Sequence, residues 1–229
     1  MQNLDKKGIV FSLGGSLVVP KRIDWKFLRR FRNFILKLIP LTKRVVIVVG
    51  GGNLSREYNK AAELIAKISD KDLDLLGISA TKLNAELIRV ILSKQSFEKV
   101  VNRPRKIRTK KQIIVASGWK PGCSTDKDAV LWAKHFNISS IINLTNIDFV
   151  YSADPKKDPH AQPLGKIGWK DYLKIIPSNW SPRLSTPFDP VASRIAKKNK
   201  IRVVILNGYN LRNIWSYFRG KGFKGTVIG

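Results

Sequence analysis

The apolar positions of the chain fall into short runs of Val, Ile and Leu, separated by longer stretches with helical spacing. The clearest run is Val45–Val49, five consecutive Val or Ile residues followed at once by three glycines. Such a run is typical of a strand buried on both faces of a parallel sheet. The run from Gly8 to Leu13 ends in the same way, at Gly14 and Gly15. Both patterns predict a strand followed by a glycine turn.

Elsewhere, apolar residues recur every three or four positions, which predicts helices. Asp24 stands where it can cap the first of them. The predicted helices cover residues 24–38, 54–68, 73–92, 124–136, 169–175, 190–198 and 211–218, and the predicted strands cover 8–13, 45–49, 97–101, 112–117, 140–144, 202–206 and 226–228. Strands alternating with helices predict a single α/β domain with a mostly parallel central sheet covered on both faces.

Polar loops, three of them rich in glycine, follow four of the predicted strands. They begin near Gly14, Gly50, Gly118 and Thr145. Ligands of parallel sheets collect beyond the carboxyl ends of the strands, so we expect these loops to meet in one crevice. A glycine turn that opens a helix offers free N–H groups and a positive dipole end, which favour a phosphate. The alternative for one such turn is a tight connection without a ligand, but two of them favour two halves of one phosphate site.

Composition narrows the class of protein. None of the apolar runs in the 229 residues approaches the roughly 20 needed to span a bilayer, and the first is too short for a signal peptide. We therefore expect no membrane partner. One cysteine excludes an internal disulfide and fits a reducing compartment, so we expect the protein in the cytoplasm by default. Two histidines and one cysteine form no metal-ligand cluster, so we predict no protein-bound metal site.

The charge balance is strongly basic. Lys and Arg number 43 against 16 Asp and Glu, a formal net charge of +27. This excess attracts anionic metabolites and polyanions, so nucleic acid is a candidate partner. The basic residues are spread along the chain, however, and the densest stretch, residues 99–111, lacks an accompanying zinc-finger or aromatic RNA-binding signature. A dedicated nucleic-acid function is therefore not favoured.

With these loops in view, nearly the whole chain resembles the amino-acid kinase family, and within it the uridylate (UMP) kinases, the archaeal type especially. The most specific motif is the string from Asn146 to Pro159, with Asp148, Val150 and Tyr151 inside it. The other motifs are Gly14-Gly15-Ser16, residues 48–56, 74–77, 121–126 and 189–192.

The resemblance implies transfer of a phosphoryl group from ATP to UMP, giving UDP and ADP, a step of pyrimidine nucleotide biosynthesis. It implies ATP with Mg²⁺ carried by the nucleotide, a three-layer αβα sandwich, and a homo-oligomer, commonly a hexamer assembled from dimers. It also divides the single domain, residues 1–229, into an acceptor side of about 1–137 and an ATP side of about 138–229.

The resemblance further implies three sets of contacts, carried over by motif position. The ATP phosphates would face Ser12, Leu13, Gly14, Gly15, Ser16, Gly52 and Arg56. UMP would be surrounded by Gly51, Asp74, Trp119, Lys120, Pro121, Gly122, Cys123, Ser124 and Thr125. The adenine nucleoside would contact Thr145, Tyr151 and Asp154.

Two residues are candidates for catalysis. Phosphoryl transfer needs positioning and charge neutralisation more than a strong base. Arg56, one turn into a predicted helix, can bridge phosphate oxygens. Asp126 can orient a cation or water near the transferred group, or cap the helix that follows. Asp74 can accept a hydrogen bond from a ribose hydroxyl, or cap the long helix, and Tyr151 can contact a base or pack in the core.

The chain departs from the family pattern at four positions. Ser12 stands where many relatives carry a charged residue, Trp119 replaces a usual Thr, and Ser117 and Phe149 replace glycines. A large indole at Trp119 would narrow the acceptor pocket. Two alternatives therefore stay open: a kinase of the same fold for another small phosphate or carboxylate acceptor, and a catalytically weak relative that binds nucleotide or RNA.

Overall fold

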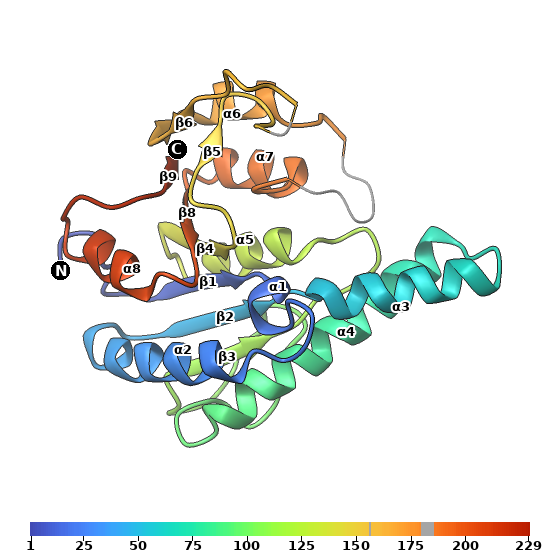
Figure 1. Cartoon of the computed structure of the whole chain (residues 1–229). Coiled ribbons are helices and arrows are strands. Elements are labelled where there is room, and N and C mark those ends of the chain that lie inside the picture. The colour runs from blue at the N-terminus through green and yellow to red at the C-terminus, as the bar shows by residue number, and fades with distance from the viewer. Residues whose placement is uncertain (156, 180–185) are drawn as a thin grey trace.

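The middle layer of the protein is a seven-stranded sheet. A computed structural model describes residues 1–155, 157–179 and 186–229. The strand order is β3-β2-β1-β4-β8-β9-β7 (Figure 1). The strands are β1 (Ile9–Leu13), β2 (Val45–Val49), β3 (Ile113–Ala116), β4 (Ser140–Thr145), β7 (Lys166–Ile167), β8 (Arg202–Asn207) and β9 (Thr226–Ile228). Only the β8–β9 pair is antiparallel among these described strands, which confirms a mostly parallel sheet.

Helices cover both faces of the sheet and complete the αβα sandwich. One apolar cluster buries side chains of α2 (Trp25–Leu38), α4 (Asp70–Ile91) and α8 (Leu211–Phe218) against one face. A second cluster buries α5 (Thr125–His135), α6 (Trp169–Ile175) and α7 (Pro190–Lys198) against the other (Figure 1). Every residue of β1 and β2 is buried, as their continuous apolar runs require.

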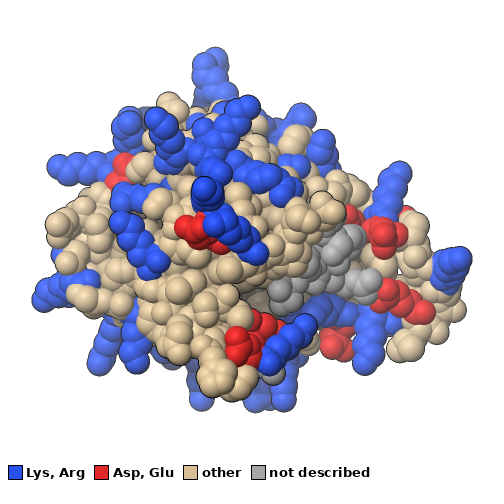
Figure 2. Space-filling view, turned by 90° about the horizontal axis from the view of Figure 1, so that it is seen from above, with Lys and Arg blue, Asp and Glu red and all other residues tan. Residues whose placement is uncertain are grey.

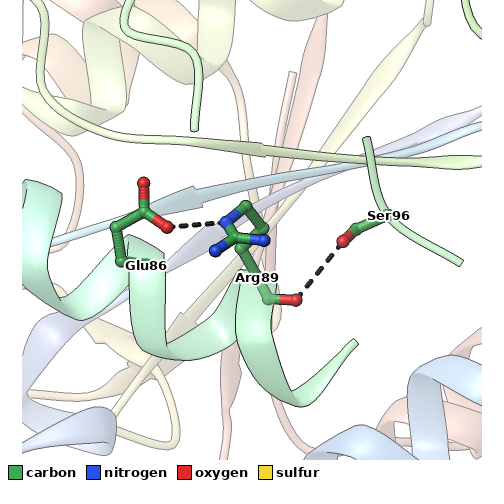
Figure 3. Close-up of polar contacts among 3 residues, drawn as sticks. All are labelled: Glu86, Arg89 and Ser96. Carbon is green, nitrogen blue, oxygen red and sulfur yellow. Dashed lines mark hydrogen bonds and ion pairs between the residues drawn. The ribbon is translucent and has the colours of Figure 1, made fainter. Parts of the chain in front are cut away.

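Helices α3 (Gly52–Ile65) and α4 lie side by side and project from the body as an arm (Figure 1). The far end of α3 is exposed, with Ile65 85% exposed. The C-terminal turn of α4 is tied to the body. Arg32 Nε of α2 donates to the Ile91 carbonyl at 2.8 Å, and Ser96 Oγ donates to the Arg89 carbonyl at 3.3 Å, while Arg89 Nε donates to Glu86 Oε2 at 2.6 Å within α4 (Figure 3). One end of α4 is thus fixed while its other turns approach the glycine loops.

Capping residues determine where the helices begin, and some helices therefore start at other residues than predicted. Ser69 Oγ accepts from the Asp72 N–H at 3.1 Å, so α4 begins at Asp70, which removes the alternative that Asp74 is the cap. Ser124 caps α5 by accepting from the Lys127 N–H at 3.0 Å, so Asp126 is not the cap either. Asp24 caps α2 as predicted.

The strand predicted over 97–101 was wrong. In place of a continuous strand, two isolated bridges join Ser96 and Val101 to β3. Several short elements carry no periodic pattern: α1 (Gly15–Val18), η1 (Ile39–Leu41), β5 (Val150–Tyr151) and β6 (Pro163–Leu164). Strands β5 and β6 form a two-stranded antiparallel ribbon inside the long polar loop.

The basic residues remain spread out in three dimensions. Figure 2 shows Lys and Arg side chains over much of the face seen from above, with few Asp and Glu. Two salt bridges are present within the described ranges, Glu86–Arg89 and Asp171–Lys174. Most of the cations in these ranges therefore keep their charge free for anions in solution.

Candidate active site

The glycine loops meet at one cavity of about 630 Å³ at the carboxyl ends of β1, β2 and β4. Strands β2 and β4 lie on opposite sides of β1, so the order of the strands reverses there. Ligands of parallel sheets bind beyond the carboxyl ends of the strands at such a reversal. Most of the predicted site residues line it: Ser12, Gly14, Gly15, Ser16, Gly51, Gly52, Arg56, Asp74, Cys123, Ser124, Thr125, Asp126 and Thr145.

The two glycine turns lie directly against each other. A Cβ on Gly15 would come within 2.6 Å of the Gly50 carbonyl carbon, and a Cβ on Gly52 within 2.6 Å of the Ser16 nitrogen. Gly52 also has φ +61°, a conformation that side chains rarely adopt. Glycine is therefore required here for both space and backbone shape, and the two turns form one continuous surface of main-chain atoms.

Two full-length helices begin at this cavity. Helix α3 starts at Gly52 and α5 at Thr125, and both residues line it. The first N–H groups of a helix have no partner within the helix, and the dipole adds partial positive charge at the same end. Two such ends facing one space create a site for an anion with several oxygens.

Side chains of helix α4 hold the glycine loops in place by hydrogen bonds. The side-chain amide of Asn84, itself buried, donates to the carbonyls of Gly50 and Gly51, both at 3.0 Å. Thr81 Oγ1 accepts from the Gly118 N–H at 2.9 Å, and Asp74 Oδ2 accepts from the Gly122 N–H at 2.8 Å. Sequence reasoning missed Asn84 and Thr81; the signal was a polar residue at a core position of an amphipathic helix.

Two carboxyl groups meet at the edge of the cavity: the half-buried Asp126, which lines it, and the buried Asp189. Asp126 Oδ1 accepts from Ser12 Oγ at 3.0 Å, and its Oδ2 accepts from the Asp189 N–H at 3.3 Å. Burial, followed by repulsion from the Asp189 carboxylate, raises the pKa of Asp126 to about 7. Asp189 caps α7 and accepts a hydrogen bond from Ser124 Oγ. These contacts join the loop before α5 to the start of α7.

A third carboxyl group, Asp128, lies behind the acceptor-side loop. Its Oδ2 accepts from the Trp119 N–H at 3.1 Å, and its buried Oδ1 has no hydrogen-bond partner within the described structure. Burial is the largest influence on this group and raises its pKa to about 7. Asp128 therefore fixes the backbone of the loop without reaching the cavity.

Arg56 is the cation at the cavity among the described lining residues. Its Nη2 donates to Ser16 Oγ at 3.3 Å, so the guanidinium spans the gap between the two glycine turns. Polar residues that sequence reasoning did not single out also line the space: Asn59, Asn143 and Thr186. The Asn143 side chain donates to the Pro187 carbonyl at 2.7 Å. The sign of its role in the sequence was a polar residue inside the apolar run of β4.

Some predicted site residues lie elsewhere. Leu13 is buried in the core, and only its carbonyl takes part, accepting from the Gly50 N–H. Trp119 lines a second cavity, so its indole does not narrow the first. Lys120, Pro121, Gly122, Tyr151 and Asp154 are also absent from the lining of the first cavity. Phe149 is not in a positive-φ conformation, and Lys156 of the long motif lies outside the described residues.

None of the helices in the described part of the chain has the length and apolar character needed to cross a membrane. No group of three or more His, Cys, Asp and Glu side chains in it is arranged to hold a metal ion.

The chain is similar in sequence and fold to proteins of one family. The model of the amino acid kinase family matches residues 7–207. Proteins named uridylate kinase from Thermococcus sibiricus and Pyrococcus abyssi are each 32% identical over 224 residues, covering 96% of this chain and 98% of theirs. The crystal structure of uridylate kinase from Archaeoglobus fulgidus matches with a TM-score of 0.80 at 32% identity, over 96% of this chain and 99% of that one. A UMP kinase from Ureaplasma parvum, 23% identical with a TM-score of 0.76, shows the same fold.

Proposed function

The chain belongs to the amino acid kinase family, and on that premise we propose that it is a uridylate kinase, which transfers the γ-phosphoryl group of ATP to UMP. The observation that carries this proposal is the contact between the two glycine turns at a cavity where α3 and α5 begin. The reaction joins two phosphate groups, so it needs one space that holds both. The chain is 32% identical to two uridylate kinases over nearly its whole length, which favours UMP over other acceptors.

We assign the phosphate contacts to the main chain of the glycine turns and to Arg56. An oxygen of the UMP phosphate forms a bond to the γ-phosphorus as the bond to ADP breaks, and negative charge spreads over the transferred group. N–H groups at the start of α3 donate to these oxygens, and the Arg56 guanidinium bridges them. Because α4 fixes the turn through Asn84, these donors are held in place before substrate binds.

We assign the acceptor side to the space between α4 and the loop before α5. Asp74 and Cys123 line this part of the cavity. The hydrogen bond from the Gly122 N–H to Asp74 holds the loop at a fixed distance from α4. The adenosine side lies toward Thr145 and Asn146, at the end of β4. This arrangement agrees with an acceptor part of about residues 1–137 and an ATP part of about 138–229, which we retain as part of the proposal.

The residues present fit a nucleotide that brings Mg²⁺ with it. Gly14, Gly15, Gly51 and Gly52 line the cavity without side chains, which suits a polyphosphate chain, and the Asp126 carboxyl supplies hard oxygen atoms beside it. Mg²⁺ bound to ATP would neutralise charge on the phosphate oxygens. The same Asp126 carboxyl accepts hydrogen bonds from the Ser12 hydroxyl and the Asp189 N–H, and so holds these two residues in place.

We further propose a cytoplasmic homo-oligomer, a hexamer built from dimers. The arm of α3 and α4 exposes apolar side chains that a monomer leaves in water: Tyr58, Leu64, Ile65, Leu75, Leu83 and Val90. Such surface favours burial against a second copy. The single free cysteine fits a reducing compartment. Sedimentation analysis tests the assembly, since a monomer at micromolar concentration would contradict it.

The test of function is an acceptor comparison. Release of ADP is followed with ATP and, in turn, UMP, CMP and small phosphorylated alcohols. We expect UMP to give the highest kcat/KM, with UDP as product. Preference for a phosphorylated alcohol would support a different kinase of the same fold, and ATP binding without turnover would support a weak relative. Arg56→Ala is compared with Lys60→Ala, which removes the same charge from the exposed side of α3.

A further inference from the structure

A second cavity lies away from the phosphate site, between α5 and the chain that precedes β3. It has a volume of about 380 Å³ and is lined by Pro104, Trp119, Leu131, Lys134 and His135. Trp119 is half-buried, so part of its indole is open to solvent. We call this space the Trp119 groove. None of the proposed phosphate-transfer chemistry uses it.

The wall of the groove that carries Pro104 is the most basic part of the chain. The basic loop, residues 99–111, contains seven cations and no acid: Lys99, Arg103, Arg105, Lys106, Arg108, Lys110 and Lys111. All but Lys111 are exposed, and none forms a salt bridge within the described structure. This loop therefore presents uncompensated positive charge beside the groove.

The basic loop is fixed to the body by apolar contacts. Val101 is buried in the core cluster that contains Trp132 of α5, and Ile107 packs against the same cluster. The loop is therefore held beside α5, where Lys134 and His135 add polar groups to the opposite wall. A cation also stands at the indole, since Lys120 Nζ lies 4.6 Å from the centre of the Trp119 ring.

An aromatic ring in the lining of a groove, with a basic loop beside it, is an arrangement suited to single-stranded nucleic acid. Bases stack on the ring whatever their identity, and cations follow the phosphates. An apolar protein partner would not explain the seven cations, and a duplex would not expose a base to the indole. We propose that the Trp119 groove binds single-stranded nucleic acid, with a base on Trp119 and the neighbouring phosphates on the basic loop. This activity is separate from the transfer of phosphate to UMP.

The test measures binding of a fluorescein-labelled oligoadenylate RNA of about a dozen nucleotides to the full-length protein. A non-hydrolysable ATP analogue and UMP are present at saturation so that the phosphate site is occupied. Fluorescence anisotropy is recorded over a range of salt concentrations. We expect binding that weakens steeply with salt and persists in the presence of both nucleotides.

Two matched double variants separate the groove from the general charge of the protein. Arg105→Ala/Arg108→Ala should lower the slope of log K against log salt by about 1.4, at roughly 0.7 for each lost phosphate contact. Arg212→Ala/Lys221→Ala removes the same charge near α8, which packs on the opposite face of the sheet, and should change the slope much less. Equal losses in the two variants would overturn the proposal, because they would show diffuse attraction to a +27 protein. Native turnover with ATP and UMP in Arg105→Ala/Arg108→Ala shows that the fold is intact.

A second pair of variants tests the stacking. Trp119→Ala should weaken binding by about 5- to 100-fold with no change in the salt slope, whereas Trp119→Phe should retain most of the affinity because Phe also stacks. Native affinity of Trp119→Ala would overturn the proposal. So would displacement of the RNA by free AMP at equal nucleotide concentration, or equal affinity for a duplex of the same length.

Discussion

Replacing Gly52 with Ala tests whether the close approach of the two glycine turns is needed for phosphate transfer. The new Cβ would lie within 2.6 Å of the Ser16 nitrogen, against 3.4 Å or more in ordinary contacts. The turns must therefore separate by at least roughly 0.8 Å, because the Gly15 carbonyl carbon and oxygen lie closer still to the new Cβ, and all of these atoms are main chain, which cannot rotate away. A misplacement of about 1 Å costs on the order of 100-fold in rate. We expect kcat/KM to fall by about that factor.

The assay is steady-state formation of UDP with ATP and UMP varied separately, beside thermal unfolding of each variant. Two matched glycines divide the effect into its parts. Gly122 also has a positive φ, +73°, but a Cβ there would meet nothing within 4 Å, so Gly122→Ala carries only the backbone strain, of order 1 kcal/mol. Gly165→Ala has neither problem, since its surroundings are open and its φ is ordinary.

The expected order of activity is therefore Gly165→Ala, then Gly122→Ala, then Gly52→Ala far below. Should Gly52→Ala fold and keep native kcat/KM, the two turns do not act as one phosphate-holding surface. A loss equal to that of Gly122→Ala would show that strain, and not the contact between turns, matters.

Three further substitutions test the surroundings of the site. Arg56→Ala should lower kcat at least ~10-fold, because it removes the guanidinium that spans the two turns, while Lys60→Ala keeps native kcat; equal values for the two would remove Arg56 from the site. Asn84→Ala leaves the Gly50 and Gly51 carbonyls without their donor and should raise KM for both substrates several-fold, as steady-state kinetics would show. Asp128→Asn tests the pKa of about 7. The folded protein binds this proton between about pH 4 and pH 7 while the unfolded chain releases it, so Asp128 costs the native protein up to ~4 kcal/mol of stability as pH rises through that window. The variant lacks this loss and keeps only the one due to Asp126, whose pKa is also about 7, so its stability falls less as pH rises. Urea unfolding at several pH values measures the difference, and parallel curves would refute the assignment.

Local patterns predicted the parts of the fold that depend on local chemistry. The runs Ile9–Leu13 and Val45–Val49 are buried over their whole length, so a continuous apolar stretch was sufficient. Asp24 could be recognised as a cap because capping involves residues only three positions apart. The convergence of the glycine loops follows from the parallel sheet, whose carboxyl ends share one edge.

Features set by distant contacts could not be predicted in this way. The segment 97–101 has apolar residues suited to a strand, but pairing depends on the course of the chain beside β3. The Trp119 side chain lines the second cavity and not the phosphate cavity, and its backbone N–H is bonded to the buried Asp128 on the next helix. Asn84 acts on a turn more than thirty residues away, with no local sign of that partner. Each depends on tertiary packing, which overrides local preference.

Single-turnover transfer from ATP radiolabelled at its γ-phosphorus tests the central claim most directly. With enzyme in excess over ATP and with UMP present, one cavity that holds both phosphates should pass the label straight to UMP. We predict that the label leaving ATP appears in UDP, at the same rate as ADP forms, and that none is bound to protein. Label released as inorganic phosphate, or transferred only when another acceptor replaces UMP, would contradict the account.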